Sequence, residues 1–148
     1  MHEGTERTAH GLPVTENPPR ILIAEDHFFV ALDCEMQLRD AGFDCVGSAS
    51  TVTEVVDLAV LKHPDLILMD IRLAHDQSGI LAASQIYEQL GIRSVFCSGH
   101  ADAATRAEAA RACPIGWLDK PYTPDALISS VREALLKLRE PVQEHVVE

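Results

Sequence analysis

Apolar and polar residues follow one another along the chain in blocks that predict five strands alternating with five helices. Short apolar runs predict strands at about 20–25, 43–48, 65–70, 93–98 and 115–118. Helical spacing of apolar residues predicts helices at about 28–41, 52–62, 79–90, 102–112 and from Pro124 to about Arg139. Strict alternation of this kind favours an α/β fold, in which helices cover both faces of a parallel sheet.

The apolar residues of the helices support these assignments. Phe29, Leu32 and Met36 stand at i, i+3 and i+7 in the first helix. The fourth helix is rich in alanine, so we expect it to be well formed but weakly anchored to the sheet. Core-facing stripes are expected in the second and fifth helices, at Val52, Val55, Val56 and Ala59 and at Leu127, Val131, Leu135 and Leu138.

Polar residues stand where four of the predicted strands end: Glu25, Asp26, Asp70, Ser98 and Lys120. Parallel strands end at the same edge of a sheet, where open α/β folds bind ligands, so these side chains should meet. Three adjacent carboxylates need a cation, and Mg²⁺ prefers such oxygen ligands. Asp70 is then the candidate nucleophile for a phosphoryl group, with Lys120 and Ser98 placed to contact its oxygens.

Composition narrows the class of protein. The 148 residues allow one domain with a proper core, and a net charge of −11 argues against nucleic-acid binding. The four cysteines form no CxxC pair and are expected to be reduced. We find no signal-peptide pattern or membrane-length apolar run, and we therefore expect a cytoplasmic protein with no membrane partner.

The two ends of the chain lack the periodicity of the middle. Residues 1–19 are expected to form a flexible tail that stops at Pro18-Pro19, before a single domain over 20–139. Residues 140–148 are expected to form a short C-terminal tail, which leaves no room there for an effector domain.

The polar residues and their spacing resemble the receiver domain of two-component response regulators, from about Arg20 to Arg139. The match comprises the Glu25-Asp26 pair, Asp70 after Leu-Ile-Leu-Met, Ser98 before a glycine, and Lys120 before a proline. The resemblance implies a flavodoxin-like, doubly wound (βα)5 fold with strand order 2-1-3-4-5. It also implies that Asp70 accepts a phosphoryl group from the phosphohistidine of a sensor histidine kinase or a histidine phosphotransfer protein.

The same resemblance implies a Mg²⁺ site. Asp26, Asp70 and the backbone carbonyl of Arg72 would hold the ion, and Glu25 would act partly through water. Short motifs after the third, fourth and fifth strands further resemble receivers that are paired with the HWE type of histidine kinase. They are Asp-Ile-Arg-Leu, Ser-Gly-His and Asp-Lys-Pro-Tyr.

Two residues depart from the usual family pattern. Trp117 stands where the family has Tyr or Phe, and Ser98 replaces the commoner Thr. We expect Ser98 and Trp117 to act as a switch that is read on the face of the fourth helix, fifth strand and last helix. A partner protein or a second copy, giving a homodimer, would bind that face.

Further expectations concern the surroundings of Asp70. Arg72 and His100 stand two residues beyond site residues and are expected to tune the lifetime of the acyl phosphate. The Lys120-Pro121 bond is expected to be cis, since X–Pro bonds are where cis is tolerated. His27 and His100 flank the edge, but a carboxylate-rich Mg²⁺ site does not need imidazole ligands.

Three functions are compatible with these residues. The favoured one is a stand-alone phosphorylatable receiver, which is a signalling protein and not an enzyme acting on other substrates. A Mg²⁺-dependent phosphatase of the haloacid dehalogenase type would need a second aspartate where this chain has Arg72. A receiver-like scaffold that is not phosphorylated would normally have lost Asp70 or Lys120.

Overall fold

The computed structural model describes residues 6–7, 13–14 and 17–140 of the chain. Most of the expected N-terminal tail, and the expected C-terminal tail beyond Glu140, lie outside these described residues. Two short strands lie inside the expected N-terminal tail. There β1 (Glu6–Arg7) pairs with β2 (Pro13–Val14) as an antiparallel ribbon.

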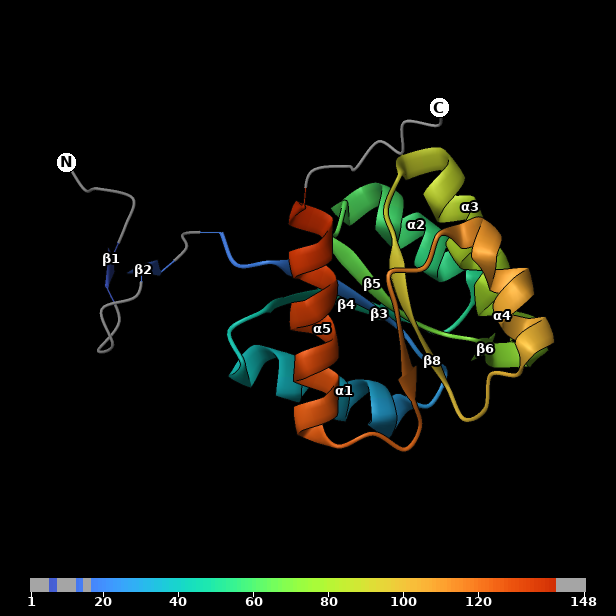
Figure 1. The fold of residues 1–148 in the computed structure, drawn as a ribbon, viewed down its shortest axis with the longest axis horizontal. Helices are drawn as coiled ribbons and strands as arrows, with labels where there is room; N and C mark the ends of the chain where they lie inside the picture. The colour runs from blue at the N-terminus through green and yellow to red at the C-terminus, as the bar shows by residue number, and fades with distance from the viewer. Residues whose placement is uncertain (1–5, 8–12, 15–16, 141–148) are drawn as a thin grey trace, which may run out of the picture.

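A five-stranded parallel sheet forms the centre of the domain (Figure 1). Its strands are β3 (Arg20–Ala24), β4 (Asp44–Ala49), β5 (Leu66–Asp70), β8 (Ser94–Ser98) and β9 (Gly116–Asp119). Across the sheet they run β4-β3-β5-β8-β9, which is the order 2-1-3-4-5 among these five strands. The fold predicted from the sequence is confirmed, including the central position of the strand that ends in Asp70.

Helices cover both faces of the sheet (Figure 1). On one face lie α1 (Phe28–Asp40) and α5 (Pro124–Arg139), whose buried residues share one core cluster. On the other lie α2 (Val52–Lys62), α3 (Gly79–Leu90) and α4 (Ala103–Ala109). A 3-10 turn over Ala110–Ala112 continues α4, so the single helix expected at 102–112 is confirmed in place but is divided in two.

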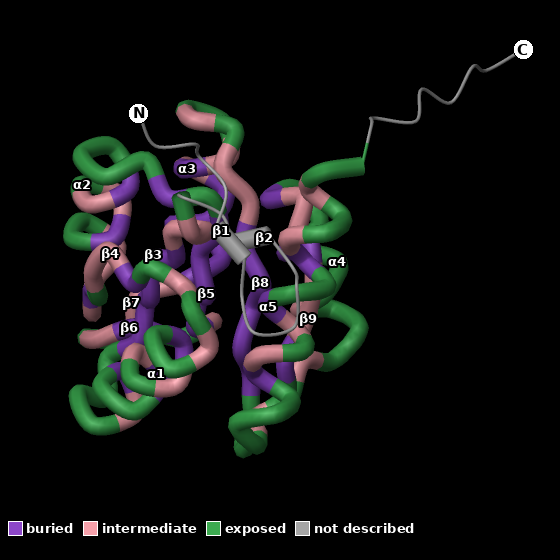
Figure 2. Tube along the Cα trace, turned by 90° about the vertical axis from the view of Figure 1, so that its left-hand side faces the viewer, coloured by how far each residue is buried: buried purple, intermediate pink, exposed green. Residues whose placement is uncertain are grey.

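The sheet is buried because helices cover it on both sides. All five residues of β5 and of β8 are buried, and the strands form the enclosed centre of the chain in Figure 2. A strand buried on both faces has no polar face, which explains the continuous apolar run from Leu66 to Met69. The expected stripes of α2 and α5 pack against this core.

The buried face of α1 is not the one marked by its large apolar residues. Ala31, Cys34 and Leu38 are buried, whereas 70% of Phe29 and 56% of Met36 are exposed. The two sets have the same i, i+3, i+7 spacing and differ by two positions, or about 200° around the helix. Periodicity therefore predicted the helix correctly but could not show which of its two apolar stripes meets the sheet.

Two short segments between β5 and α3 shape the edge of the sheet. They are β6 (Arg72–Leu73) and β7 (Gln77–Ser78), which pair as an antiparallel ribbon around a turn at Ala74–Asp76. None of the helices in the described part of the chain has both the length and the apolar character needed to cross a membrane.

Candidate functional site

Three carboxylates meet at the carboxyl edge of the sheet. Glu25 and Asp26 follow β3, Asp70 ends β5, and one oxygen of each lies within 4.8 Å of the others. Glu25 and Asp70 are buried and Asp26 is exposed. The backbone N–H of His27 donates to Glu25 Oε2 at 3.0 Å, which orients that carboxylate. The sequence prediction that these three acids come together is consistent with this geometry.

Lys120 balances the charge of this cluster. Its Nζ lies 2.8 Å from Glu25 Oε1 and 2.9 Å from Asp70 Oδ2. Burial opposes the charged form of the ammonium, but the hydrogen bonds to the two carboxylates outweigh that effect and raise the pKa of Lys120. The side chain is therefore a permanent cation at neutral pH. The Lys120-Pro121 bond that follows is cis, as the sequence predicted.

Ser98 lies on the neighbouring strand, at the end of β8. It is buried, and its Oγ accepts a hydrogen bond of 3.0 Å from the backbone N–H of His100. The backbone N–H of Lys120 donates to the carbonyl of Ser98 at 2.7 Å. This backbone contact ties the ends of β8 and β9 together and holds the hydroxyl and the ammonium on the same edge.

A pocket of about 240 Å³ opens beside Asp70. Its lining includes Asp70 and Ser98, and also Arg72, His100 and Thr105. Arg72 and His100 are exposed, and Arg72 makes a loose ion pair of 3.7 Å with Asp76. The two residues predicted to tune the lifetime of an acyl phosphate thus border the space that a phosphoryl group on Asp70 would enter.

The donor set suits a hard divalent cation. Glu25, Asp26 and Asp70 offer only carboxylate oxygens, which Mg²⁺ prefers, and the exposed Asp26 leaves one side open to water. Two buried carboxylates face a single ammonium, so the cluster keeps a net negative charge that a cation would neutralise. His27 and His100 are exposed and are not part of this carboxylate group.

Gly79, at the start of α3, supports the site and was not singled out from the sequence. A Cβ at this position would lie 1.8 Å from the backbone oxygen of Asp70, so no larger residue fits without moving the strand end. The N–H of Gly79 donates to the carbonyl of Ile71 at 2.7 Å. A single glycine nine residues after an aspartate carries no sequence signal by itself, since the close approach exists only in the fold.

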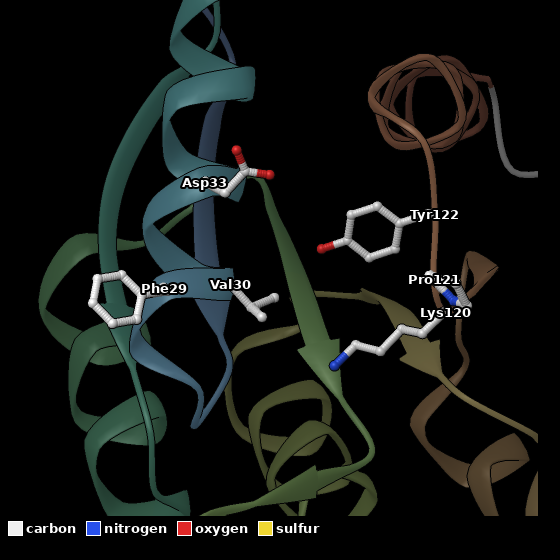
Figure 3. Close-up of a pocket in the computed structure, with 6 residues that line it drawn as sticks. All are labelled: Phe29, Val30, Asp33, Lys120, Pro121 and Tyr122. Atoms are coloured by element: carbon white, nitrogen blue, oxygen red, sulfur yellow. The ribbon is translucent and has the colours of Figure 1, made fainter.

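A second hollow, of about 560 Å³, lies on the other side of Lys120 (Figure 3). Figure 3 shows Lys120 and Tyr122 reaching from the loop after β9 toward α1, where Val30 and Asp33 face them. Burial raises the pKa of Tyr122, whose side chain packs against the core cluster that contains Cys34 of α1. Tyr122 thereby connects the lysine loop to α1, a role that the sequence did not reveal.

Comparison with known proteins shows which family this chain and its cluster of polar residues belong to. The family model of the response regulator receiver domain matches residues 21–132. The chain belongs to this family. Asp70, the acidic pair and Lys120 therefore lie in a receiver domain, as the resemblance implied.

Several relatives agree with this assignment. The chain is 33% identical over 123 residues to the transcriptional regulatory protein PdtaR of Mycobacterium tuberculosis, covering 83% of this chain and 60% of that protein. It is 32% identical over 116 residues to the phyllosphere-induced regulator PhyR of Methylorubrum extorquens, covering 78% and 43%. The chain thus spans less than two thirds of the length of these relatives.

Solved structures show the same architecture. The receiver domain of a modulated diguanylate cyclase from Desulfovibrio desulfuricans superposes with a TM-score of 0.75 at 31% identity, covering 84% of this chain and all of that one. The response regulator PhyR of Brucella abortus gives a TM-score of 0.71 at 30% identity, covering 82% and 49%. Pairing with an HWE kinase is not confirmed by these similarities and stays a prediction.

Proposed function

We propose that this receiver accepts a phosphoryl group on Asp70 from the phosphohistidine of a partner protein. The observation that carries the proposal is the position of Asp70. Its carboxylate lies between the acidic cluster, the Lys120 ammonium and the 240 Å³ pocket that Ser98 borders. Family membership makes a histidine kinase the general class of partner.

In the proposed reaction, a carboxylate oxygen of Asp70 attacks phosphorus and forms an acyl phosphate. The P–N bond to the donor imidazole breaks, and the imidazole leaves with the bonding electron pair and takes up a proton. Lys120 pairs with one phosphoryl oxygen, and the Ser98 hydroxyl donates to another. Mg²⁺ held by Glu25, Asp26, Asp70 and the Arg72 carbonyl would neutralise charge on the transferred group.

The position of Arg72 disfavours the phosphatase alternative. A phosphatase of the haloacid dehalogenase type would need a second aspartate two residues after its nucleophile, where this chain has the exposed guanidinium of Arg72. Both Asp70 and Lys120 are present and in contact, which disfavours a scaffold that is not phosphorylated. Action as a stand-alone receiver stays a prediction from the sequence.

We further propose where the phosphodonor protein docks. The exposed stripe of α1 comprises Phe28, Phe29, Leu32 and Met36, which are 69%, 70%, 40% and 56% exposed. It adjoins the 560 Å³ hollow, and Lys120 forms a wall of that hollow. A donor helix packed on this stripe would therefore lie next to the phosphorylation site. Exposed Asp26, Asp33 and Asp40 flank the stripe and favour a donor surface with basic residues.

In this proposal, a partner recognises the phosphorylated protein through the face formed by α4, β9 and α5. Ser98 leaves its bond with the His100 N–H to hold a phosphoryl oxygen, and the half-buried Trp117 on β9 responds. Another protein or a second copy of the chain would bind the altered face. Arg72 and His100, at the rim of the pocket, would set the lifetime of the acyl phosphate by obstructing water.

Intact-mass measurement with acetyl phosphate and Mg²⁺ separates the three functions. A receiver gives one stable phosphoryl adduct, which is absent when a chelator removes the metal. Release of phosphate with turnover and no adduct would indicate a phosphatase. Neither an adduct nor turnover would indicate a scaffold and would contradict the proposal.

A further inference from the structure

The ribbon of β6 and β7, between Asp70 and α3, carries one of the proposed metal ligands. In this ribbon Arg72 stands opposite Ser78, and Leu73 stands opposite Gln77. The Arg72 carbonyl is the one proposed Mg²⁺ ligand that belongs to the backbone. Its position therefore depends on how the ribbon is held against the rest of the domain.

The turn of the ribbon has an unfavourable backbone conformation. His75 and Asp76 have φ values of 59° and 60°, in the left-handed region that residues other than glycine rarely adopt. Backbone in this region persists where the surrounding contacts hold it. Leu73 is buried in the core and anchors the first strand of the ribbon. A polar side chain anchors the second strand.

That side chain is the half-buried Gln77, which joins the ribbon to the start of α2. Its Oε1 accepts a hydrogen bond of 2.8 Å from the backbone N–H of Val52, the first residue of this helix. The first N–H groups of a helix have no partner within the helix, so Gln77 supplies the acceptor. In the turn, the N–H of Ala74 donates to the carbonyl of Ser50 at 2.8 Å. Both bonds join the ribbon to the junction of β4 and α2.

The same junction also holds the acidic pair. The N–H of Glu25 donates at 2.9 Å to the carbonyl of Ala49, the last residue of β4. Residues 49–52 thus connect the acidic pair on one side to the ribbon on the other. The bond from Glu25 joins backbone atoms, as does the one from the turn of the ribbon. The bond of Gln77 involves a side chain, and a substitution can remove it.

We propose that Gln77 is a positioning residue for the metal site. By holding the ribbon against the start of α2, it fixes the Arg72 carbonyl relative to Glu25 and Asp26 and so lowers the Kd for Mg²⁺. Gln77 acts through the ribbon and is not itself a ligand. The inference rests on the proposed Mg²⁺ site, and its effect on metal affinity needs no phosphodonor.

Replacing Gln77 with methionine removes the acceptor and keeps a side chain of similar length. The free energy of unfolding in urea is measured in chelator and at increasing Mg²⁺ concentrations, because the stabilisation by a ligand gives its Kd. The Kd for Mg²⁺ should rise about threefold to tenfold in Gln77→Met, as the loss of one hydrogen bond allows. The Mg²⁺ concentration that gives half-maximal phosphorylation by acetyl phosphate should rise by the same factor. The rate at saturating Mg²⁺ should equal that of the wild type.

Two variants separate the hydrogen bond from a general loss of stability. Gln77→Glu keeps an oxygen that accepts from the Val52 N–H, and a carboxylate is favoured at a helix N-terminus. Its Kd for Mg²⁺ should therefore not rise above that of the wild type. Gln89→Met replaces an exposed glutamine near the end of α3 and should leave the Kd unchanged. Circular dichroism in chelator checks that every variant is folded.

The outcomes distinguish this inference from the proposed function. A wild-type Kd in Gln77→Met would overturn the positioning role, and so would an equal rise of the Kd in Gln77→Met and Gln77→Glu. If Mg²⁺ did not stabilise the wild type, the positioning role would fall together with the metal site. Absence of any phosphoryl adduct would instead contradict the phosphoacceptor, and the Kd values measured without phosphodonor would still decide the role of Gln77.

Discussion

At the scale of single residues, the site depends on how one ammonium balances two buried carboxylates. Lys120 Nζ contacts both Glu25 and Asp70, and these bonds raise its pKa. A metal ion among the carboxylates would share their negative charge with the lysine. The ammonium and a bound metal ion would therefore be partly interchangeable as stabilising charges.

Replacing Lys120 with methionine tests this balance. Without metal, Lys120→Met leaves two buried carboxylates without their cation and should lower the free energy of unfolding by about 1–3 kcal/mol. Excess Mg²⁺ should stabilise the variant more than the wild type, as measured by urea unfolding in chelator and in Mg²⁺. Lys137→Met on α5 is the exposed control. If Mg²⁺ raised the free energy of unfolding of Lys120→Met and of the wild type equally, the idea that Lys120 and the metal both balance the carboxylate charge would be contradicted.

Burial also determines the reactivity of the cysteines. Cys34, Cys45 and Cys97 are buried, and burial raises the pKa of all three thiols, that of Cys34 to about 12. They stay protonated at neutral pH, and the thiolate is the reactive form. In the folded protein, iodoacetamide should therefore label the half-exposed Cys113 first, and all four only after unfolding. Mass mapping that finds early labelling of Cys34 or Cys97 would contradict this.

Gly79 gives a third test at this scale. A methyl group at Gly79 would collide with the backbone oxygen of Asp70, so Gly79→Ala should displace the end of β5. Over-packing of this kind usually lowers stability by about 1–3 kcal/mol. The rate of phosphorylation by acetyl phosphate should fall together with stability. Gly91→Ala at the end of α3 is a spatially unhindered comparison, although its positive φ adds strain of its own. If acetyl phosphate phosphorylated Gly79→Ala at the wild-type rate, the proposed role of Gly79 in positioning the end of β5 would be refuted.

At the scale of elements, α1 shows what the spacing of apolar residues predicts and what it does not predict. Its existence and bounds follow from spacing, but its larger apolar residues face outward. The sheet accepts the smaller stripe of Ala31, Cys34 and Leu38, which lets the helix approach closely. Which stripe is buried depends on the packing of α1 against β3, β4 and α5, and a single helix does not encode that choice.

The exposed stripe of α1 predicts a difference between protein and small-molecule phosphodonors. Phe29→Asp should slow phosphotransfer from a phosphohistidine protein, because it places a charge in the proposed docking surface. Phosphorylation by acetyl phosphate, which needs no docking, should keep its wild-type rate. Leu81→Asp, on α3 across the sheet and 51% exposed, is the matched control. Equal rates of protein-dependent transfer in both variants would place the docking surface elsewhere.

At the scale of the whole molecule, the parallel sheet makes the site predictable. Residues as far apart as Glu25 and Lys120 meet because every strand of the sheet ends at the same edge. The order of the strands and the approach of the acids to Lys120 were therefore accessible from alternation and spacing together with the family resemblance. The contacts of Gln77, Tyr122 and Gly79 could not be predicted from the sequence. Each joins residues of different elements, and such contacts produce no periodic pattern in the sequence.

The central claim is that Asp70 carries the phosphoryl group, and locating the acyl phosphate tests it most directly. Protein treated with acetyl phosphate and Mg²⁺ is reduced with borohydride, which converts a phosphorylated aspartate to homoserine, and is then mapped by peptide mass spectrometry. The account predicts homoserine at position 70 alone, and no conversion in Asp70→Asn. Homoserine at position 26 or 119 of the wild type, or labelling of Asp70→Asn at the wild-type rate, would contradict it.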